Sequence, residues 1–284
     1  MTSHDMVSLV RKKTGIKRVG HTGTLDPNAA GVLPICIGQA TRVSEYLLEN
    51  DKQYRVEMKL GITTDTQDAY GTITNQREVT VSSKEVEQAL LSFVGEYDQV
   101  PPMYSALKVK GKKLYQLARE GIEVKRKSRR VTIYKIEIIK NDHGIILFDI
   151  LCSKGTYVRT LCHDIGEKLG CGAVMSFLLR TSAGRFDILS AVTLEELNSM
   201  DDIGDIEINL KPMDFPLEYM PRVSINPIYE RAAYNGNQIP IDEVPPPSAI
   251  GDIIRIYLKD NFIGIGIIRE NDGKLHIKFS KLFA

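Results

Sequence analysis

Residues 52–60 alternate apolar and polar side chains with the two-residue period of a β-strand, which puts Tyr54, Val56, Met58 and Leu60 on one face. Strand patterns lie at residues 52–60, 131–139 and 144–152. Helical patterns lie at residues 3–13, 41–48, 83–94 and 159–168. Because these helices are interspersed without a regular strand–helix–strand repeat, the sequence predicts an α+β fold. We expect a mixed, mainly antiparallel sheet with flanking helices.

The C-terminal part of the chain has a different pattern. Short β-prone runs lie at residues 253–258, 262–268 and 275–279. They are separated by Lys-Asp-Asn (259–261) and Asn-Asp-Gly (271–273), which are typical of hairpin turns. We therefore expect two domains, with residues 1–218 forming the larger one and residues 219–284 a small β-rich one.

The composition is that of a globular protein. Hydrophobic residues make up 43% and charged residues 26% of the 284 residues, which is enough apolar surface for a sizeable core. The sequence has no apolar run of about 18 residues, and its N-terminus lacks the basic and apolar segments of a secretory signal. Its four cysteines show neither a C-x-x-C pair nor a zinc-ligand spacing. These features predict a cytoplasmic protein with reduced cysteines and no membrane span.

Charge is distributed unevenly along the chain, although the formal net charge is only +1. Residues 106–130 carry a net charge of +8, and residues 195–218 carry −7. The basic side chains of the first segment are Lys108, Lys110, Lys112, Lys113, Arg119, Lys125, Arg126, Lys127, Arg129 and Arg130. A local basic field suits a polyphosphate ligand, and a solvated surface loop is the alternative interpretation.

Residues 20–34 read GHTGTLDPNAAGVLP, and residues 20–31 of this segment predict a loop. The segment lacks the Gly-Lys-Ser/Thr of a P-loop, and its first two residues differ from the Asp-Lys that the aspartyl-phosphate motif of ion-pumping ATPases requires. Pro27 directs the backbone of Asp26 toward an extended conformation, and Gly23 and Gly31 permit tight turns and close approach of a ligand. Local chemistry alone leaves two alternatives, a solvated Asx-Pro turn or a site that presents one carboxylate to a ligand.

The same loop begins a series of motifs that runs through most of the chain. The later members are GQATR (38–42), KQY (52–54), LGITTDT with Asp68 and Gly71 (60–71), PPMYSALK (101–108), SKGTYVRT (153–160) and L-x-R-x-x-x-G (178–184). In this order, over residues 2–215, the series resembles the signature of the TruB family of tRNA pseudouridine synthases. That family usually begins with a strand and a Lys-Pro pair before the Thr-Ser-His-Asp found here at residues 2–5, so this chain starts inside the motif.

The resemblance implies an RNA-modifying enzyme. The family's reaction breaks the N1–C1′ bond of a uridine, turns the uracil and rejoins it through C5, so neither a cofactor nor a metal is expected. The implied substrate is tRNA, in which the uridine at position 55, in the T-loop of the T-arm, is flipped out of its stack. The β-rich C-terminal part resembles the PUA-like RNA-binding domain that ends bacterial members.

Three residues match the family's catalytic positions. Asp26 matches the aspartate that acts at the ribose, and attack on C1′ and removal of the C2′ proton remain alternatives. Tyr54 matches the tyrosine that stacks on the flipped base near C5, with a place in the core as the alternative. Arg159 matches the arginine that pairs with the aspartate.

Other residues match positions that contact the substrate. The resemblance places Tyr157 and Leu178 in the uracil pocket, with simple core packing as the alternative, and His21 beside the flipped nucleotide. Arg180 and Lys108 are also expected to bind the substrate. The basic segment 106–130, which includes Lys108, has the composition of an insertion that grips phosphates.

Two other functions are compatible with this scaffold. One is a non-catalytic RNA-binding or RNA-folding protein, which would have no need of Asp26, Tyr54 and Arg159 together. The other is a guide-RNA-dependent paralogue that acts on ribosomal RNA within a complex, whose members usually carry lysine-rich tails or dedicated partner surfaces. We find neither feature in this sequence and therefore expect a stand-alone, monomeric enzyme with no obligate protein partner.

Overall fold

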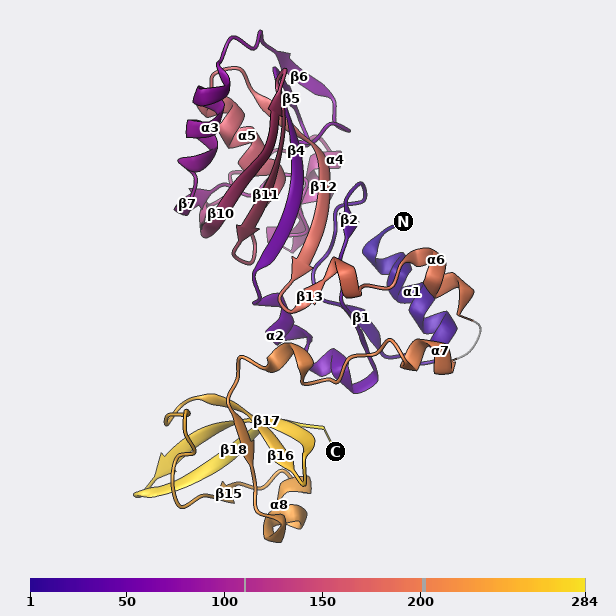
Figure 1. The fold of residues 1–284 in the computed structure, drawn as a ribbon, viewed down its shortest axis with the longest axis vertical. Coiled ribbons are helices and arrows are strands. Elements are labelled where there is room, and N and C mark those ends of the chain that lie inside the picture. The colour runs from indigo at the N-terminus through magenta and orange to yellow at the C-terminus, as the bar shows by residue number, and fades with distance from the viewer. Residues whose placement is uncertain (110, 201–202, 284) are drawn as a thin grey trace. The chain divides into compact units, whose positions relative to one another are not determined.

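The computed structural model describes residues 1–109, 111–200 and 203–283 (Figure 1). Lys110 of the basic segment and Asp201 and Asp202 of the acidic stretch lie outside the described residues. The chain forms two compact units. The first unit comprises Met1–Ser3, Gly23–Pro34 and Leu48–Ala191, and the second comprises His4–Thr22, Ile35–Leu47 and Val192 onward.

A seven-stranded sheet forms the centre of the first unit (Figure 1). Six strands follow in the order β13 (Phe186–Asp187), β12 (Ala173–Ala183), β4 (Lys52–Leu60), β11 (Ile145–Cys152), β10 (Arg129–Asp142) and β7 (Gly95–Gln99). These neighbours pair antiparallel, whereas the short β2 (Ala30–Gly31) runs parallel to β12. The mixed, mainly antiparallel sheet predicted from the sequence is confirmed.

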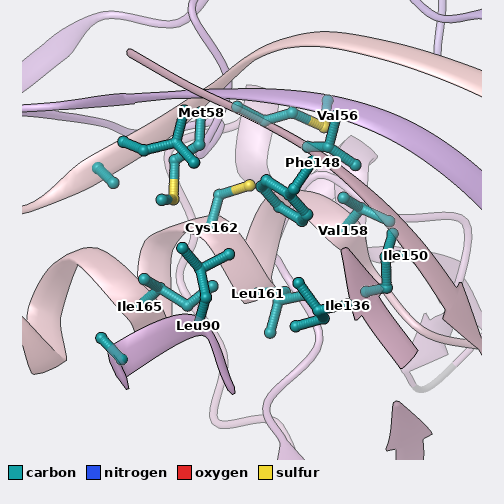
Figure 2. Packing of buried hydrophobic residues seen from close by; sticks show 14 of the residues in the cluster. Val56, Met58, Leu90, Ile136, Phe148, Ile150, Val158, Leu161, Cys162 and Ile165 are labelled. Atoms are coloured by element: carbon teal, nitrogen blue, oxygen red, sulfur yellow. The ribbon is translucent and has the colours of Figure 1, made fainter. Parts of the chain in front are cut away.

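Two helices, α3 (Ser83–Leu91) and α5 (Val158–Lys168), cover one face of this sheet (Figure 1). Figure 2 shows Val56 and Phe148 of the sheet near Leu161 and Ile165 of α5 and Leu90 of α3. All five side chains are fully buried, and the removal of their apolar surface from water stabilises the helix–sheet contact by roughly 25 cal/mol per Å². Burial of this face therefore fixes α5, and with it the first helical turn, against the sheet.

The predicted strands and helices of this unit are present, with ends shifted by a few residues. β4 has the predicted bounds, and α3 follows Ser82, which forms a capping box with Glu85. β12 was not predicted. Register shifts next to Ser176 and Thr181 interrupt its pairing with β4, and such bulges destroy the two-residue alternation by which a strand is recognised.

The basic segment 106–130 follows β7 and ends in β10. It contains the hairpin of β8 (Lys108–Val109) and β9 (Lys112–Lys113), followed by α4 (Leu114–Arg119). Leu114 and Leu117 anchor α4 by burial. A second hairpin of the first unit pairs β5 (Ile62–Thr64) with β6 (Ile73–Gln76), and a short helix, η2 (Ile188–Ser190), follows β13.

The second unit contains a five-stranded sheet with its own core. Its strands follow in the order β14 (Arg222–Ser224), β16 (Ile253–Leu258), β17 (Asn261–Asn271), β18 (Lys274–Leu282) and β15 (Ile239–Pro240). Both predicted hairpins, β16–β17 and β17–β18, are present. Ile254, Ile256, Ile268 and Ile277 are fully buried between this sheet and its short helices. Those helices are η4 (Pro227–Tyr229) and α8 (Glu230–Tyr234).

Segments from the N-terminal part of the chain belong to this second unit. They are α1 (Ser3–Thr14), β1 (Val19–His21), β3 (Ile35–Ile37), η1 (Gly38–Arg42) and α2 (Ser44–Leu48), joined by α6 (Leu194–Ser199), α7 (Ile203–Glu207) and η3 (Phe215–Leu217). Arg42 donates to the carbonyl of Leu282, and Lys281 forms an ion pair with Glu45. The second unit is therefore discontinuous in sequence. The sequence pattern predicts a single domain boundary after residue 218, and that boundary remains a prediction.

Among the described residues, no helix combines the length and the apolar character needed to cross a bilayer. All four cysteines are free and buried. Burial raises the pKa of the Cys36 thiol to about 11 and that of Cys152 to about 12, so both thiols remain protonated near neutral pH.

We expect a protein that ends at Pro221 to remain folded. The core of the first unit includes no residue beyond Leu178, so the sheet keeps its apolar contacts, while those of Arg42 and Glu45 with the C-terminal strand are lost. Circular dichroism should show a cooperative thermal transition, with its midpoint lowered by roughly 2–4 °C for each kcal/mol of lost stability. Absence of a cooperative transition would contradict the independent folding of the larger domain.

Candidate active site

Asp26 lies in a loop that is tied down on both sides of the carboxylate. On one side, the Leu25 N–H donates to Ser3 Oγ at 3.0 Å. On the other, the Ala29 N–H donates to the Asp26 carbonyl at 2.9 Å, which closes a turn whose second residue, Pro27, is preset for that position. The Asp26 side chain is 36% exposed, so the loop presents a carboxylate that a ligand can reach.

Arg159 grips both oxygens of this carboxylate. Its Nε donates to Asp26 Oδ2 at 2.7 Å and its Nη2 to Oδ1 at 3.1 Å, which is the bidentate geometry that fixes a carboxylate in orientation as well as in position. Arg159 lies in the first turn of α5 and is only 5% exposed. The structure thus brings together two residues that are 133 positions apart in the chain and that the sequence predicts to pair.

The other donors of Arg159 are held by two loops of the first unit. Nη1 donates to the Thr66 carbonyl at 2.9 Å, Nη2 also donates to the Tyr104 carbonyl at 3.1 Å, and Asp68 Oδ2 lies 3.9 Å from Nη1. Both loops belong to motifs in the sequence, 60–71 and 101–108, for which sequence reasoning assigned no contact with Arg159. Their backbones supply the acceptors that fix the guanidinium group.

The Thr66 loop is itself closely packed. Thr64 Oγ1 donates to the Asp68 carbonyl at 2.6 Å and Thr66 Oγ1 to Asp68 Oδ1 at 2.7 Å. A Cβ atom at Gly71 would lie 2.2 Å from Thr66 Oγ1, so only glycine fits at that position. The acceptor for Arg159 is therefore part of a rigid loop.

Arg180 holds the Asp26 loop by hydrogen bonds to two of its carbonyl groups. Its Nε donates to the Val32 carbonyl at 2.7 Å and its Nη2 to the Gly23 carbonyl at 3.3 Å, so one guanidinium spans the loop before and after Asp26. A Cβ at Gly31 would lie 2.2 Å from the Arg180 carbonyl, which makes glycine necessary for the pairing of β2 with β12. Arg180 is 2% exposed, which places it as an internal brace, and a direct contact with substrate remains a prediction.

Tyr54 lies on β4 directly opposite Arg180 of β12. Its ring packs against the core of the first unit, and the positive charge of Arg180 opposes the effect of burial on the pKa of its hydroxyl. Burial raises the pKa of Tyr54 to about 12. The hydroxyl therefore remains neutral across the physiological range and can act in hydrogen bonding beside a ring face that is suited to stacking.

The remaining predicted residues occupy different surroundings. Tyr157 immediately precedes α5, and the Arg129 guanidinium lies over its ring at 4.6 Å from the centroid. Leu178 is 6% exposed within the core, opposite Val56, and Lys108 is exposed on the β8–β9 hairpin. His21 belongs to the second unit, where it ends β1 opposite Ile35. The substrate contacts of these residues remain predictions.

The described residues hold no group of three or more His, Cys, Asp or Glu side chains placed to bind a metal ion. The geometry assembles one carboxylate in the fork of one arginine, and the charge of Asp26 adds to the effect of burial in raising the pKa of the Tyr54 hydroxyl. Such a set can perform nucleophilic or general-base chemistry on a bound ligand.

Comparison with known proteins agrees with this arrangement. The chain resembles a chain of the solved Cbf5–Nop10–Gar1 complex, with a TM-score of 0.77 and 27% sequence identity over 100% of this chain and 82% of that chain. It is 55% identical to the tRNA pseudouridine synthase B of Alkaliphilus oremlandii, over 99% of this chain and 94% of the relative. It is 46% identical to that of Clostridioides difficile, over 100% of this chain and 96% of the relative.

Fold and site together define an enzyme of the pseudouridine synthase class. Residues 11–158 match the TruB family pseudouridylate synthase N-terminal domain, and residues 159–219 match the tRNA pseudouridylate synthase B C-terminal domain. The chain belongs to the TruB family.

Proposed function

We propose that this protein converts a uridine of tRNA to pseudouridine, at position 55 in the T-loop, with Asp26 acting at the ribose and without a cofactor. The observation that supports this most is the bidentate fork of Arg159 on Asp26. It fixes a single carboxylate in a partly exposed loop, where a flipped nucleotide can reach it. Family membership supports tRNA as the class of substrate.

The reaction balances without an external reactant. The N1–C1′ bond breaks, the uracil turns within the pocket, a C5–C1′ bond forms, and the proton on C5 is replaced by one on N1. Asp26 either attacks C1′ and is later displaced, or removes the C2′ proton and later returns it. In both routes the carboxylate must meet the ribose in one orientation, which is what a two-point grip by Arg159 provides.

Tyr54 and Tyr157 are proposed to hold the uracil while it is detached. An aromatic ring can stack on the flipped base, which has left its own stack in the RNA. The Tyr54 hydroxyl, kept neutral by its raised pKa, is a hydrogen-bond partner for the base and does not carry charge into the pocket. We propose that Leu178 contacts the same base and, separately, that His21 contacts the substrate RNA, as the family motif implies.

The basic segment 106–130 is proposed to bind the tRNA backbone. Lys108, Lys112, Lys125 and Lys127 are exposed along it, and a cluster of exposed cations attracts phosphates irrespective of sequence. The C-terminal sheet is proposed to be a PUA-like module that adds RNA contacts. We propose that the enzyme acts as a monomer in the cytoplasm and needs no protein partner.

The direct test uses the purified protein and an unmodified tRNA transcript alone. Chemical mapping is expected to show one new pseudouridine in the T-loop, at position 55. A matched transcript with cytidine at that position should remain unmodified. A guide-RNA-dependent enzyme or a pure RNA-binding protein would modify neither transcript, so an unmodified uridine transcript would contradict the proposal.

Reversing the charge of Lys108, Lys125 and Lys127 to Glu is expected to weaken tRNA binding and flatten its salt dependence. Arg126 is left intact because it bonds with the Pro101 carbonyl and with Glu123. The loss of three phosphate contacts should lower the slope of log K against log salt by roughly 2–3 units.

The matched control reverses three exposed lysines elsewhere in the first unit, Lys84, Lys135 and Lys140, so the total change in charge is the same. This control is expected to change the salt slope much less. Equal slopes for the two triple variants would show that the basic segment is merely solvated surface.

A further inference from the structure

The helix that carries Arg159 begins without a local cap. Tyr157 occupies the N-cap position of α5 in an extended conformation, with φ −95° and ψ 106°, and no side-chain cap is formed there. Ser, Thr, Asp and Asn are preferred at this position because their side chains accept from the first N–H groups of the helix. The start of α5, two residues before Arg159, must therefore be fixed by another part of the fold.

Gln99, at the end of β7, provides this fixation. Its Oε1 accepts from the Tyr157 N–H at 2.8 Å, and its Nε2 donates to the Tyr157 carbonyl at 3.0 Å. Nε2 also hydrogen-bonds with the Tyr97 hydroxyl. The Gln99 amide thus binds both the N–H and the carbonyl of Tyr157, as the backbone of a neighbouring strand would. Gln99 is fully buried, with 0% exposure, so water does not compete for these hydrogen bonds.

Arg129 holds the same residue by its ring. It pairs with Gln99 in the register of β7 and β10, its guanidinium lies 4.6 Å from the Tyr157 ring centroid, and it donates to the Gly155 carbonyl. Backbone and ring of Tyr157 are thus held by two residues that face each other across one rung of the sheet. Residues 100–128, which connect Gln99 to Arg129, contain most of the basic segment, so this pair of residues also joins the two ends of that connection.

We propose that Gln99 is a positioning residue of the active site, which fixes Tyr157 and, through the first turn of α5, the arginine that grips Asp26. The Tyr157 carbonyl that receives Gln99 also accepts the first helical hydrogen bond, from the Leu161 N–H at 3.0 Å. A displacement of Tyr157 would therefore also displace Arg159, because Arg159 lies between Tyr157 and Leu161 in the first turn of α5. The proposal rests on the proposed function, because the placement of Tyr157 and Arg159 affects the rate only if they serve the reaction.

The test compares Gln99→Met with a matched control. Methionine keeps the length and apolar volume of glutamine but removes both hydrogen bonds to Tyr157. At saturating enzyme, the single-turnover rate is expected to fall roughly 10²-fold, as for small misplacements of reacting groups, while the Kd for tRNA stays within about threefold because Gln99 is too buried to touch RNA. Hydrogen exchange measured by mass spectrometry should become faster in residues 156–161.

The control is Ser82→Ala, which removes the two side-chain hydrogen bonds between Ser82 and Glu85 that cap the start of α3, the other helix on this face of the sheet. It should lower the thermal midpoint without changing the rate or the exchange of residues 156–161. A merely structural Gln99 would behave like this control, and an unchanged rate or unchanged exchange in Gln99→Met would overturn the proposal.

Two further outcomes are distinguishable. If Gln99→Met does not fold, Gln99→Asn takes its place, because its amide is one methylene shorter and cannot span both Tyr157 groups, and the same split between rate and affinity is expected. If the wild-type protein fails to modify tRNA, the proposed function falls. Hydrogen exchange needs no substrate, so it would still support or overturn the placement of Tyr157 by Gln99.

Discussion

Asp26→Asn is expected to abolish pseudouridine formation while leaving a folded protein. Asparagine is nearly isosteric with aspartate, but its amide can neither attack C1′ nor take up the C2′ proton. Loss of such a group lowers rates by roughly 10²–10⁴-fold or more, and tRNA affinity should remain within about tenfold because the proposed phosphate contacts of the basic segment are not changed. A single-turnover assay at saturating enzyme measures the chemical step separately from binding.

The sheet offers a matched control in a second arginine–aspartate fork. Arg55 Nε and Nη2 donate to the two oxygens of Asp149, both at 2.8 Å, and this pair lies on the solvent side of β4 and β11, with side chains 45% and 22% exposed. Asp149→Asn changes the same chemical group in the same kind of fork and should keep the wild-type rate. Near wild-type turnover of Asp26→Asn would remove Asp26 from the mechanism.

The sequence predicted much of the fold because hydrophobic periodicity is a local property. β4 shows its buried face directly, since Val56 and Met58 alternate with polar residues, and the Ser82–Glu85 capping box marks where α3 begins. β12 escaped prediction because its bulges break that alternation. The discontinuity of the second unit has no local signal, because the contact of Arg42 with Leu282 joins residues 240 positions apart, and the domain boundary at residue 218 stays a prediction.

For the active site, the sequence predicted which residues take part but not which groups surround each of them. The family motif predicted the pairing of Asp26 with Arg159, which periodicity alone could not have done. It identified Arg180 by type, but it could not show that the guanidinium turns inward to Val32 and Gly23. Gln99 carries no sequence signal, because a single glutamine at the end of a polar strand is ordinary, and only its complete burial shows that it has partners.

Arg159→Ala is expected to lower the single-turnover rate by at least roughly 10²-fold. The change removes both N–H donors from Asp26 and leaves the carbonyls of Thr66 and Tyr104 without their donor. Breaking a buried ion pair by removing one partner typically costs ~3–5 kcal/mol. That cost falls on stability; the rate falls because the Asp26 carboxylate, 36% exposed, is no longer held in one orientation, and small misplacements of a reacting group lower rates by roughly 10²-fold.

Arg159→Lys separates the contribution of charge from that of geometry. An ammonium restores a positive charge near Asp26 but lacks the planar fork that holds both oxygens, so the expected rate lies between those of Arg159→Ala and the wild type. Arg55→Ala, which opens the exposed fork with Asp149, should leave the rate unchanged and thus shows that losing an arginine–aspartate pair is not harmful in itself. If Arg159→Lys equals the wild type, charge alone suffices. If Arg159→Ala also equals it, Arg159 does not position Asp26, and another group must orient the carboxylate.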